Sequence, residues 1–223
     1  MQRVVTPELL DSDAGSPAEV AASLLDLRDL NRFLGGISLT ATLFERVAQA
    51  RQLSALSVLD VAGGEGYLLA RVIRHLARKQ ISVTGTILDR AHTHMQPTAY
   101  SLTAVRGDAL ALPFQDESFD VVTCNLFLHH LDPAEAQQFF REAARVARYA
   151  VVANDLERNW IHWRLAQLGG LIYRSRITRN DAPASVRRAY TEQEMHDLLK
   201  PLGFRFEVIQ SFFFRLGVCV WKG

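Results

Sequence analysis

Three glycines stand within four positions of the sequence VLDVAGGEGYLLARV, between an apolar run and an amphipathic one. Glycine has no side chain, so a ligand can approach its backbone closely. If a helix begins directly after this turn, its first N–H groups have no partner within the helix and suit a polar ligand. The spacing of Gly63, Gly64 and Gly66 therefore predicts a ligand site. The alternative is a sharp turn with no ligand.

Two adjacent histidines follow a later apolar run, in the sequence LFLHHLDP. Histidine ordinarily titrates near neutral pH, so His129 and His130 are both candidate general bases. Only one of them can point inward, because neighbouring side chains in extended or turn geometry diverge. The alternative is a structural role, with one imidazole bonded to backbone near the helix cap at Asp132. Asp155 follows the next apolar run and could orient an acceptor or tether the segment after it through Arg158 or Arg164.

The elements that must position these residues follow from the periodicity of the apolar side chains. Buried strands are predicted at residues 56–62, 81–89, 102–109, 119–128 and 149–157. Helices are predicted between them, with capping residues at Ser16, Asp132 and Thr191, and a hairpin closes the chain over 204–221. This alternation predicts an α/β fold: a Rossmann-like, seven-stranded, mainly parallel sheet with helices on both faces. Ligands bind beyond the carboxyl ends of such strands, where the glycines and histidines fall.

Residues 158–190 interrupt the alternation, because about thirty residues stand where a connection usually takes a few. Trp160, Trp163 and Leu168 lie at helical offsets, so we expect a short cap helix that pairs with the N-terminal helices. The segment over 90–100 is predicted as helix or turn. We expect a single domain over residues 1–223, with an N-terminal helical lid over 1–50 and the cap as an insertion.

The composition limits the possible partners. The chain has 25 Lys and Arg against 24 Asp and Glu, so its formal net charge of +1 gives no reason to expect a nucleic acid or an acidic membrane. The 2 cysteines cannot form a disulfide framework, and their spacing fits no zinc site. With no leader pattern or long apolar run, we expect a cytoplasmic monomer or homodimer that acts on a small molecule.

Four segments resemble, in order, the motifs of class I S-adenosylmethionine-dependent methyltransferases: VLDVAGGEGYLLARV, TILDRAHTHM, GDALALP and TCNLFLHHLDP. The dinucleotide fingerprint G-x-G-x-x-G fails, because Leu69 stands where its last glycine should be. The resemblance implies S-adenosylmethionine as the cofactor. It assigns the cofactor-binding residues to Asp60, Ala62, Gly63, Gly64, Gly66, Asp89, Arg90, Asp108, Ala109, Asn125 and Leu126.

The resemblance also implies individual roles. Asp89 would hold the ribose hydroxyls, for which a carboxylate is suited because it accepts both protons, although an Asp there could equally cap a helix. Asp108 would lie by the adenine amino group, and Asn125 would line the active site. Asp60 would brace loop amides or approach the methionine amino group. Glu65 replaces a small polar residue, and we expect it to face solvent.

The chemistry expected of such a site needs little beyond positioning, and a general base if the acceptor is a phenol. Metal-dependent catechol methyltransferases offer an Asp at the end of the fourth strand. Asn125 stands there, so no metal is expected. A looser similarity to bacterial small-molecule methyltransferases implies an acceptor of polyketide or phenolic pathways. The aromatic residues expected around the pocket suit a flat, uncharged, aromatic acceptor. Its pocket is expected to contain Phe33, Phe127, Asn154, Trp160 and Trp163.

The sequence therefore predicts an O-methyltransferase that acts on the hydroxyl of a small phenolic acceptor. Its catalytic residues are predicted among His129, His130 and Asp155. Carbon or nitrogen methylation in quinone-type biosynthesis is the nearest alternative. A non-catalytic module that binds the cofactor and regulates a partner is an alternative of another class.

Overall fold

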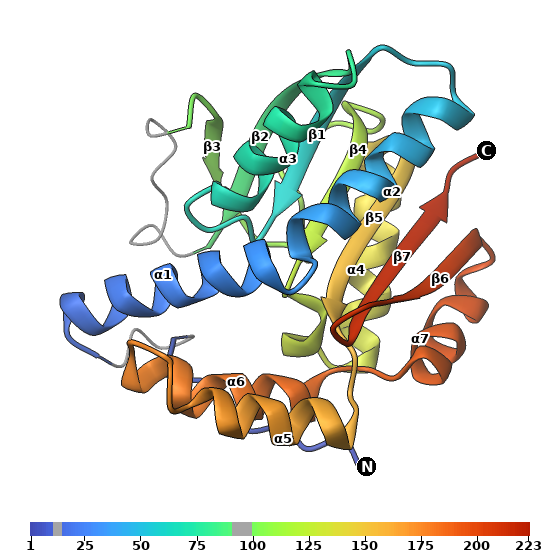
Figure 1. The fold of residues 1–223 in the computed structure, drawn as a ribbon. Coiled ribbons are helices and arrows are strands. Elements are labelled where there is room, and N and C mark those ends of the chain that lie inside the picture. The colour runs from blue at the N-terminus through green and yellow to red at the C-terminus, as the bar shows by residue number, and fades with distance from the viewer. Residues whose placement is uncertain (11–14, 91–99) are drawn as a thin grey trace.

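The computed structural model describes residues 1–10, 15–90 and 100–223 of the chain. The described residues form a seven-stranded sheet in the order β3-β2-β1-β4-β5-β7-β6 (Figure 1). Neighbouring strands are parallel except that β7 runs antiparallel to both β5 and β6. The strands are β1 Ala55–Val61, β2 Ser82–Asp89, β3 Thr103–Arg106, β4 Phe119–Asn125, β5 Ala147–Leu156, β6 Arg205–Ser211 and β7 Arg215–Trp221. The predicted α/β sheet and its closing hairpin are confirmed.

The helices begin where the capping residues predict. Ser16, Asp132 and Thr191 each accept a bond from the amide three residues on, and the glutamate there bonds back to the cap. The predicted segment over 90–100 lies almost entirely outside the described residues. The described helices are α1 Pro17–Phe33, α2 Gly36–Ala50, α3 Tyr67–Ala77, α4 Pro133–Val146, α5 Trp160–Gly169, α6 Arg176–Arg188 and α7 Glu192–Leu199, with short 3-10 turns η4 Leu128–His130 and η5 Lys200–Leu202.

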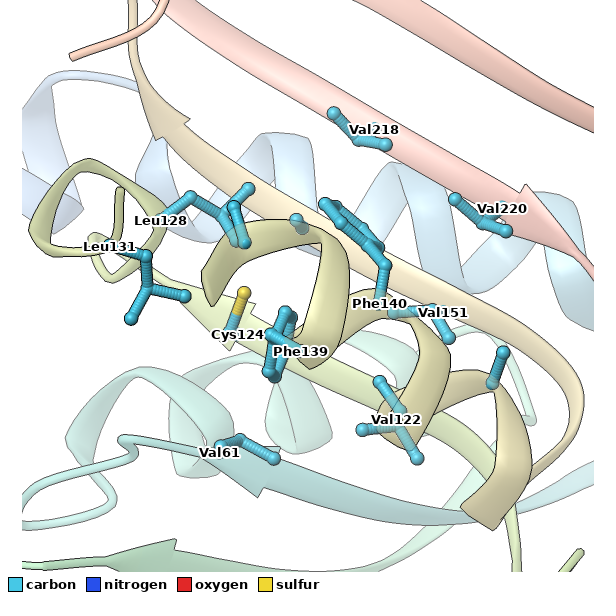
Figure 2. Packing of buried hydrophobic residues seen from close by; sticks show 14 of the residues in the cluster. Val61, Val122, Cys124, Leu128, Leu131, Phe139, Phe140, Val151, Val218 and Val220 are labelled. Atoms are coloured by element: carbon cyan, nitrogen blue, oxygen red, sulfur yellow. The ribbon is translucent and has the colours of Figure 1, made fainter. Parts of the chain in front are cut away.

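Helices cover both faces of the sheet. On one face, α2 and α3 bury Phe44 and Leu69 against the strands. On the other face, α4 and α7 pack on β4, β5 and β6, and Figure 2 shows Phe139 of α4 beside Cys124 of β4 and Phe140 near Val151 of β5. These residues are fully or almost fully buried. The two apolar layers hold the strands in place and thereby fix where their carboxyl ends lie.

The cap consists of two helices rather than the one predicted. α5 and α6 lie side by side beyond the ends to which β1, β4 and β5 point, and α6 also packs on α1 (Figure 1). The polar composition of α6 and its internal Pro183 hide its helical period. The buried Asp26 of α1 fastens the cap, because its carboxylate accepts bonds from the amides of Arg174 and Ser175.

The predicted N-terminal lid divides into two parts in the structure. α2 belongs to the core on one sheet face, whereas α1 lies across the carboxyl edge of the sheet. Among the described residues, no helix is both long and apolar enough to cross a membrane.

Candidate active site

The glycine turn between β1 and α3 leaves open space above one residue. Gly64 has a φ of +52°, and a Cβ placed on it would have no atom within 4 Å. Gly66 has a φ of +79°, which strains any residue with a side chain, and its Cβ would lie 2.6 Å from a methyl group of Leu102 that would have to move. Gly63 is also crowded, by Asp60 and Ile87 at 3.1–3.2 Å. The turn therefore reverses the chain tightly at Gly63 and Gly66 and leaves the backbone of Gly64 open to a ligand. This open backbone at Gly64 is called the ledge.

Asp89 extends from the end of β2 to this turn. Its carboxylate Oδ2 accepts a bond from the Gly64 amide at 2.9 Å. The carboxyl ends of β1 and β2 lie side by side because the two strands pair in parallel, with Val61 opposite Leu88. The predicted neighbourhood of Asp89 and the glycines is thus present, and its role toward a ribose stays a prediction.

Asp60 is a buried carboxylate beside the same turn. It is 2% exposed, and its Oδ1 lies 3.5 Å from the side-chain amide of Asn125. Burial raises the pKa of Asp60 to about 7, and the nearby charge of Asp89 adds to the rise. Asn125 is held in turn by Thr40, whose hydroxyl donates to its Oδ1 at 2.7 Å. A carboxylate in this setting suits a positively charged partner such as an amino group.

These residues open into one cavity of about 1100 Å³, between the strand ends and helices α1, α5 and α6. Its volume is large enough for a cofactor and an acceptor together. The predicted residues that line it are Asp60, Ala62, Gly63, Gly64, Asp89, Arg90, Asp108, Ala109, Asn125, Leu126, Phe127, His129 and His130. Gly66 lies just behind the turn and does not line the cavity.

His129 and Asp155 form a buried pair at the ends of β4 and β5. The Nδ1 of His129 lies 2.6 Å from Oδ1 of Asp155, and the His129 amide donates to Oδ2 at 3.1 Å. Burial opposes ionisation, yet His129 and these bonds hold the pKa of Asp155 below its usual range. An ionised Asp155 accepts a hydrogen bond from the N–H at Nδ1, and His129 lines the cavity with the rest of its ring.

Asp155 itself does not line the cavity, so it orients His129 rather than touching an acceptor. The alternative in which Asp155 tethers the cap is wrong, because Arg158 pairs with Glu194 and Arg164 approaches Gln167.

Glu8 was not predicted, and it reaches the same pair of histidines from the N-terminal segment. Its Oε1 lies 3.6 Å from Nε2 of His129, and its Oε2 lies 4.0 Å from Nε2 of His130. The amides of Leu9 and Leu10 bond to the carboxylate of Asp181 on α6, which fixes this segment. Ligand atoms of Glu8, His129 and His130 lie within 4.8 Å of one another and could hold a metal ion. That no metal is needed stays a prediction.

Four residues predicted for the acceptor pocket lie outside the cavity. Asn154 is fully buried and donates to the Gly36 carbonyl and to Thr40, so it fastens α2 to β5. Phe33 and Trp160 are more than 60% exposed on the outer sides of their helices. Trp163 is half-buried and lies under the guanidinium of Arg164. Aromatic composition alone did not reveal which side of a helix faces the cavity.

Further residues of the site have little signal in the sequence. Glu65 does not face solvent, because it is 7% exposed and forms a two-pronged ion pair with Arg28 of α1, with both bonds at 2.5 Å. The buried Arg215 at the start of β7 lines the cavity, as does His162 of α5. Glu65 stands inside the motif, but its partner Arg28 is 37 residues away.

The matched family and the curated relatives agree with the motifs. Residues 58–149 match the model of a methyltransferase domain. Over 109 residues the chain is 37% identical to phthiotriol/phenolphthiotriol dimycocerosates methyltransferase 1 of Mycobacterium ulcerans, covering 48% of this chain and 39% of that protein. It is 33% identical over 96 residues to the ubiquinone/menaquinone biosynthesis C-methyltransferase UbiE of Ruegeria, covering 41% and 38%. The matches span about two fifths of these relatives.

Solved structures share the fold over almost the whole chain. The plantazolicin methyltransferase BpumL in complex with SAH has a TM-score of 0.73 at 12% identity, covering 96% of this chain and 94% of that one. An O-methyltransferase family 2 protein from Planctomyces limnophilus in complex with apigenin has a TM-score of 0.64 at 18% identity, covering 95% and 63%.

The fold and the matched domain together define the class. Residues 58–149 match a methyltransferase domain, and the fold is the class I methyltransferase fold that the four motifs predicted. S-adenosylmethionine is the cofactor of this class, and its demethylated product is the ligand bound in the plantazolicin enzyme. The open ledge at Gly64 and the carboxylates of Asp60 and Asp89 fit that cofactor.

Proposed function

We propose that this protein transfers a methyl group from S-adenosylmethionine to the hydroxyl of a small phenolic acceptor, with His129 as the general base. The observation that carries the proposal is the buried pair of His129 and Asp155, because His129 lines the same cavity as the glycine turn while Asp155 holds it from behind. A module that only binds a cofactor has no need of an oriented base at the acceptor end.

The cofactor would be held by residues of β1, β2 and β4. The backbone of Gly63 and Gly64 would lie against the cofactor, and Asp89 would accept hydrogen bonds from its ribose hydroxyls. The negative charge of the buried Asp60 would compensate the positive charge of its amino group. Asp108 and Ala109 line the cavity at the end of β3 and would border the adenine. When bound, S-adenosylmethionine supplies a methyl group on a positively charged sulfur.

His129 would take the proton of the acceptor hydroxyl at Nε2 as the oxygen forms its bond to the methyl carbon. The carbon–sulfur bond breaks and its electron pair stays on sulfur, so the leaving group is neutral. Asp155 stabilises the imidazolium that forms and keeps Nε2 directed at the acceptor. The enclosing helices α1, α5 and α6 limit water around this step.

Carbon methylation is a second candidate, supported by the similarity to a UbiE C-methyltransferase. The same base would serve there, because loss of a phenolic proton makes the ring carbon beside the oxygen more nucleophilic. The two products differ in chemistry: an O-methyl product has lost its hydroxyl, whereas a C-methyl product retains it.

The test is a panel of phenols, catechols and quinols incubated with S-adenosylmethionine, with mass and NMR detection of the methylated position. We expect His129→Asn to lower kcat by about 10²- to 10⁴-fold, the usual worth of a general base. Asp155→Asn should lower kcat and shift the pH profile of kcat. His130→Asn, at the neighbouring histidine, is the matched control and should lower kcat less than His129→Asn does. S-adenosylhomocysteine should bind all three variants with unchanged affinity. If His129→Asn remains fully active on every methylated acceptor, His129 is not the base.

A further inference from the structure

Arg215 is a buried cation in the cavity wall with an unused hydrogen-bond donor. It is 2% exposed. Its Nε donates to the Leu34 carbonyl at 3.3 Å and its Nη2 donates to Oδ1 of Asn31 at 3.2 Å. Its Nη1 has no hydrogen-bond partner among the described residues, and none of the carboxylates described forms an ion pair with it.

Burying Arg215 with one nitrogen unpartnered in the described part of the chain raises the free energy of the folded protein when no ligand is bound. Removing an unpaired charge from water costs several kcal/mol, and buried donors in folded proteins nearly always have partners. Burial lowers the pKa of Arg215 to about 10, and the charge of Asp155 offsets only part of this effect. The guanidinium therefore stays charged at neutral pH, and an oxygen with negative charge is the partner that its Nη1 lacks.

The sheet order places Arg215 at the acceptor end of the cavity. The cofactor-binding residues stand at the ends of β1, β2, β3 and β4, whereas Arg215 begins β7 opposite Leu156 of β5. β7 is three strands from β1, which corresponds to roughly 14 Å at the usual spacing of neighbouring strands. The base, His129, follows β4 and lies between these two regions.

The surroundings of Arg215 suit a flat ring. His162 stacks on Phe214 with ring centres 5.1 Å apart and planes 13° from parallel, and both side chains line the cavity. Burial lowers the pKa of His162, and the positive charge of Arg215 lowers it further. A neutral His162 adds no second positive charge beside Arg215.

We propose that Arg215 binds the carboxylate of the acceptor, so that the substrates are small hydroxylated aromatic acids. This proposal rests on the function proposed above and adds the substrate class. The acid would pair with Nη1 of Arg215 while its hydroxyl lies at His129. Leu34 and Asn31 hold the other two guanidinium nitrogens, and Arg215 is part of the cavity wall.

The first test uses the wild-type enzyme and matched acceptors. Hydroxybenzoic and hydroxycinnamic acids are compared with their primary amides, which have nearly the same shape and no charge. We expect kcat/KM to favour the acids at least tenfold, because only the acid offers a negatively charged acceptor to the guanidinium of Arg215. Equal kcat/KM for acids and amides would overturn the proposal.

The second test uses variants. Arg215→Gln should remove the preference for acids while S-adenosylhomocysteine affinity stays within twofold, and Arg215→Lys should restore part of it. Arg164→Gln on the exposed side of α5 is the control and should keep the preference. The same carboxylate chemistry occurs on the methionine part of the cofactor. If Arg215→Gln weakens cofactor binding and leaves the preference for acids, Arg215 serves the cofactor and the proposal fails.

A third measurement separates this proposal from folding effects and from the proposed reaction. The melting temperature of the wild-type protein with S-adenosylhomocysteine is measured with each acid and each amide. The acids should raise it and the amides should not, even if no methylated product forms. Methylation of neutral phenols with no stabilisation by any acid would leave the proposed function standing and would refute the role of Arg215.

Discussion

Replacing Asp60 with asparagine should make the protein more stable and its cofactor binding weaker. Asparagine has the same shape and can still accept the bond from Asn125, but it carries no charge. The native protein holds Asp60 in a site 2% exposed, where burial raises its pKa from 3.8 to about 7. The ionised carboxylate is therefore destabilised in the folded state relative to the unfolded chain.

The size and pH dependence of the gain follow from this pKa. Above pH 7 Asp60 is ionised in both states, and the folded state carries the full cost of about 4 kcal/mol. Well below its unfolded pKa of 3.8, Asp60 is protonated in both states, and the cost vanishes. We therefore expect Asp60→Asn to raise the free energy of unfolding by up to about 4 kcal/mol at pH 8 and by about 2 kcal/mol at pH 5.

Urea unfolding at the two pH values measures this difference, and calorimetric titration with S-adenosylhomocysteine measures the cofactor affinity. Affinity should fall at least tenfold, because the variant lacks the charge that faces the amino group. Asp197→Asn, an exposed carboxylate on α7, is the control and should change neither quantity. A variant no more stable than wild type at pH 8, or one that binds the cofactor normally, would refute the account of Asp60.

Four further predictions concern the cofactor turn and the metal question. Asp89→Ala should lower the affinity for S-adenosylhomocysteine, measured by titration, about 10- to 100-fold, because the ribose hydroxyls lose hydrogen bonds to a charged acceptor. Unchanged affinity would show that Asp89 does not hold the ribose. Gly66→Ala should cost about 1–3 kcal/mol in urea unfolding, because its φ is +79° and Leu102 lies 2.6 Å from the new methyl group. In Gly64→Ala no atom lies within 4 Å of the new methyl group, so this variant should lose less stability than Gly66→Ala. It should instead bind S-adenosylhomocysteine more weakly, and normal binding would contradict the open ledge for the cofactor. EDTA should leave methyl transfer intact, and loss of activity that Mg²⁺ or Zn²⁺ restores would show that the metal-free prediction is wrong.

The sequence predicts the parts of this site that depend on neighbouring residues. The caps at Ser16, Asp132 and Thr191 are local patterns, and all three form. The parallel arrangement brings the ends of consecutive strands to one edge, so the strand pattern alone is enough to place Asp60 and Asp89 together.

The acceptor side depends on orientation and on distant parts of the chain. Asn154 and Asp155 are neighbours in β5, and successive side chains of a strand point to opposite faces. Asp155 therefore meets His129 while Asn154 meets α2, and the sequence does not indicate which way each points. Glu8 approaches His129 from a distant part of the chain, and no periodicity predicts such a pair.

The most direct test of the account is calorimetric titration of the wild-type protein with S-adenosylhomocysteine and, in parallel, with NADH. A nucleotide resting on the Gly64 ledge, with Asp89 and Asp60 beside it, predicts one binding site for S-adenosylhomocysteine and no detectable binding of NADH. Binding of NADH alone, or no binding of S-adenosylhomocysteine, would contradict it.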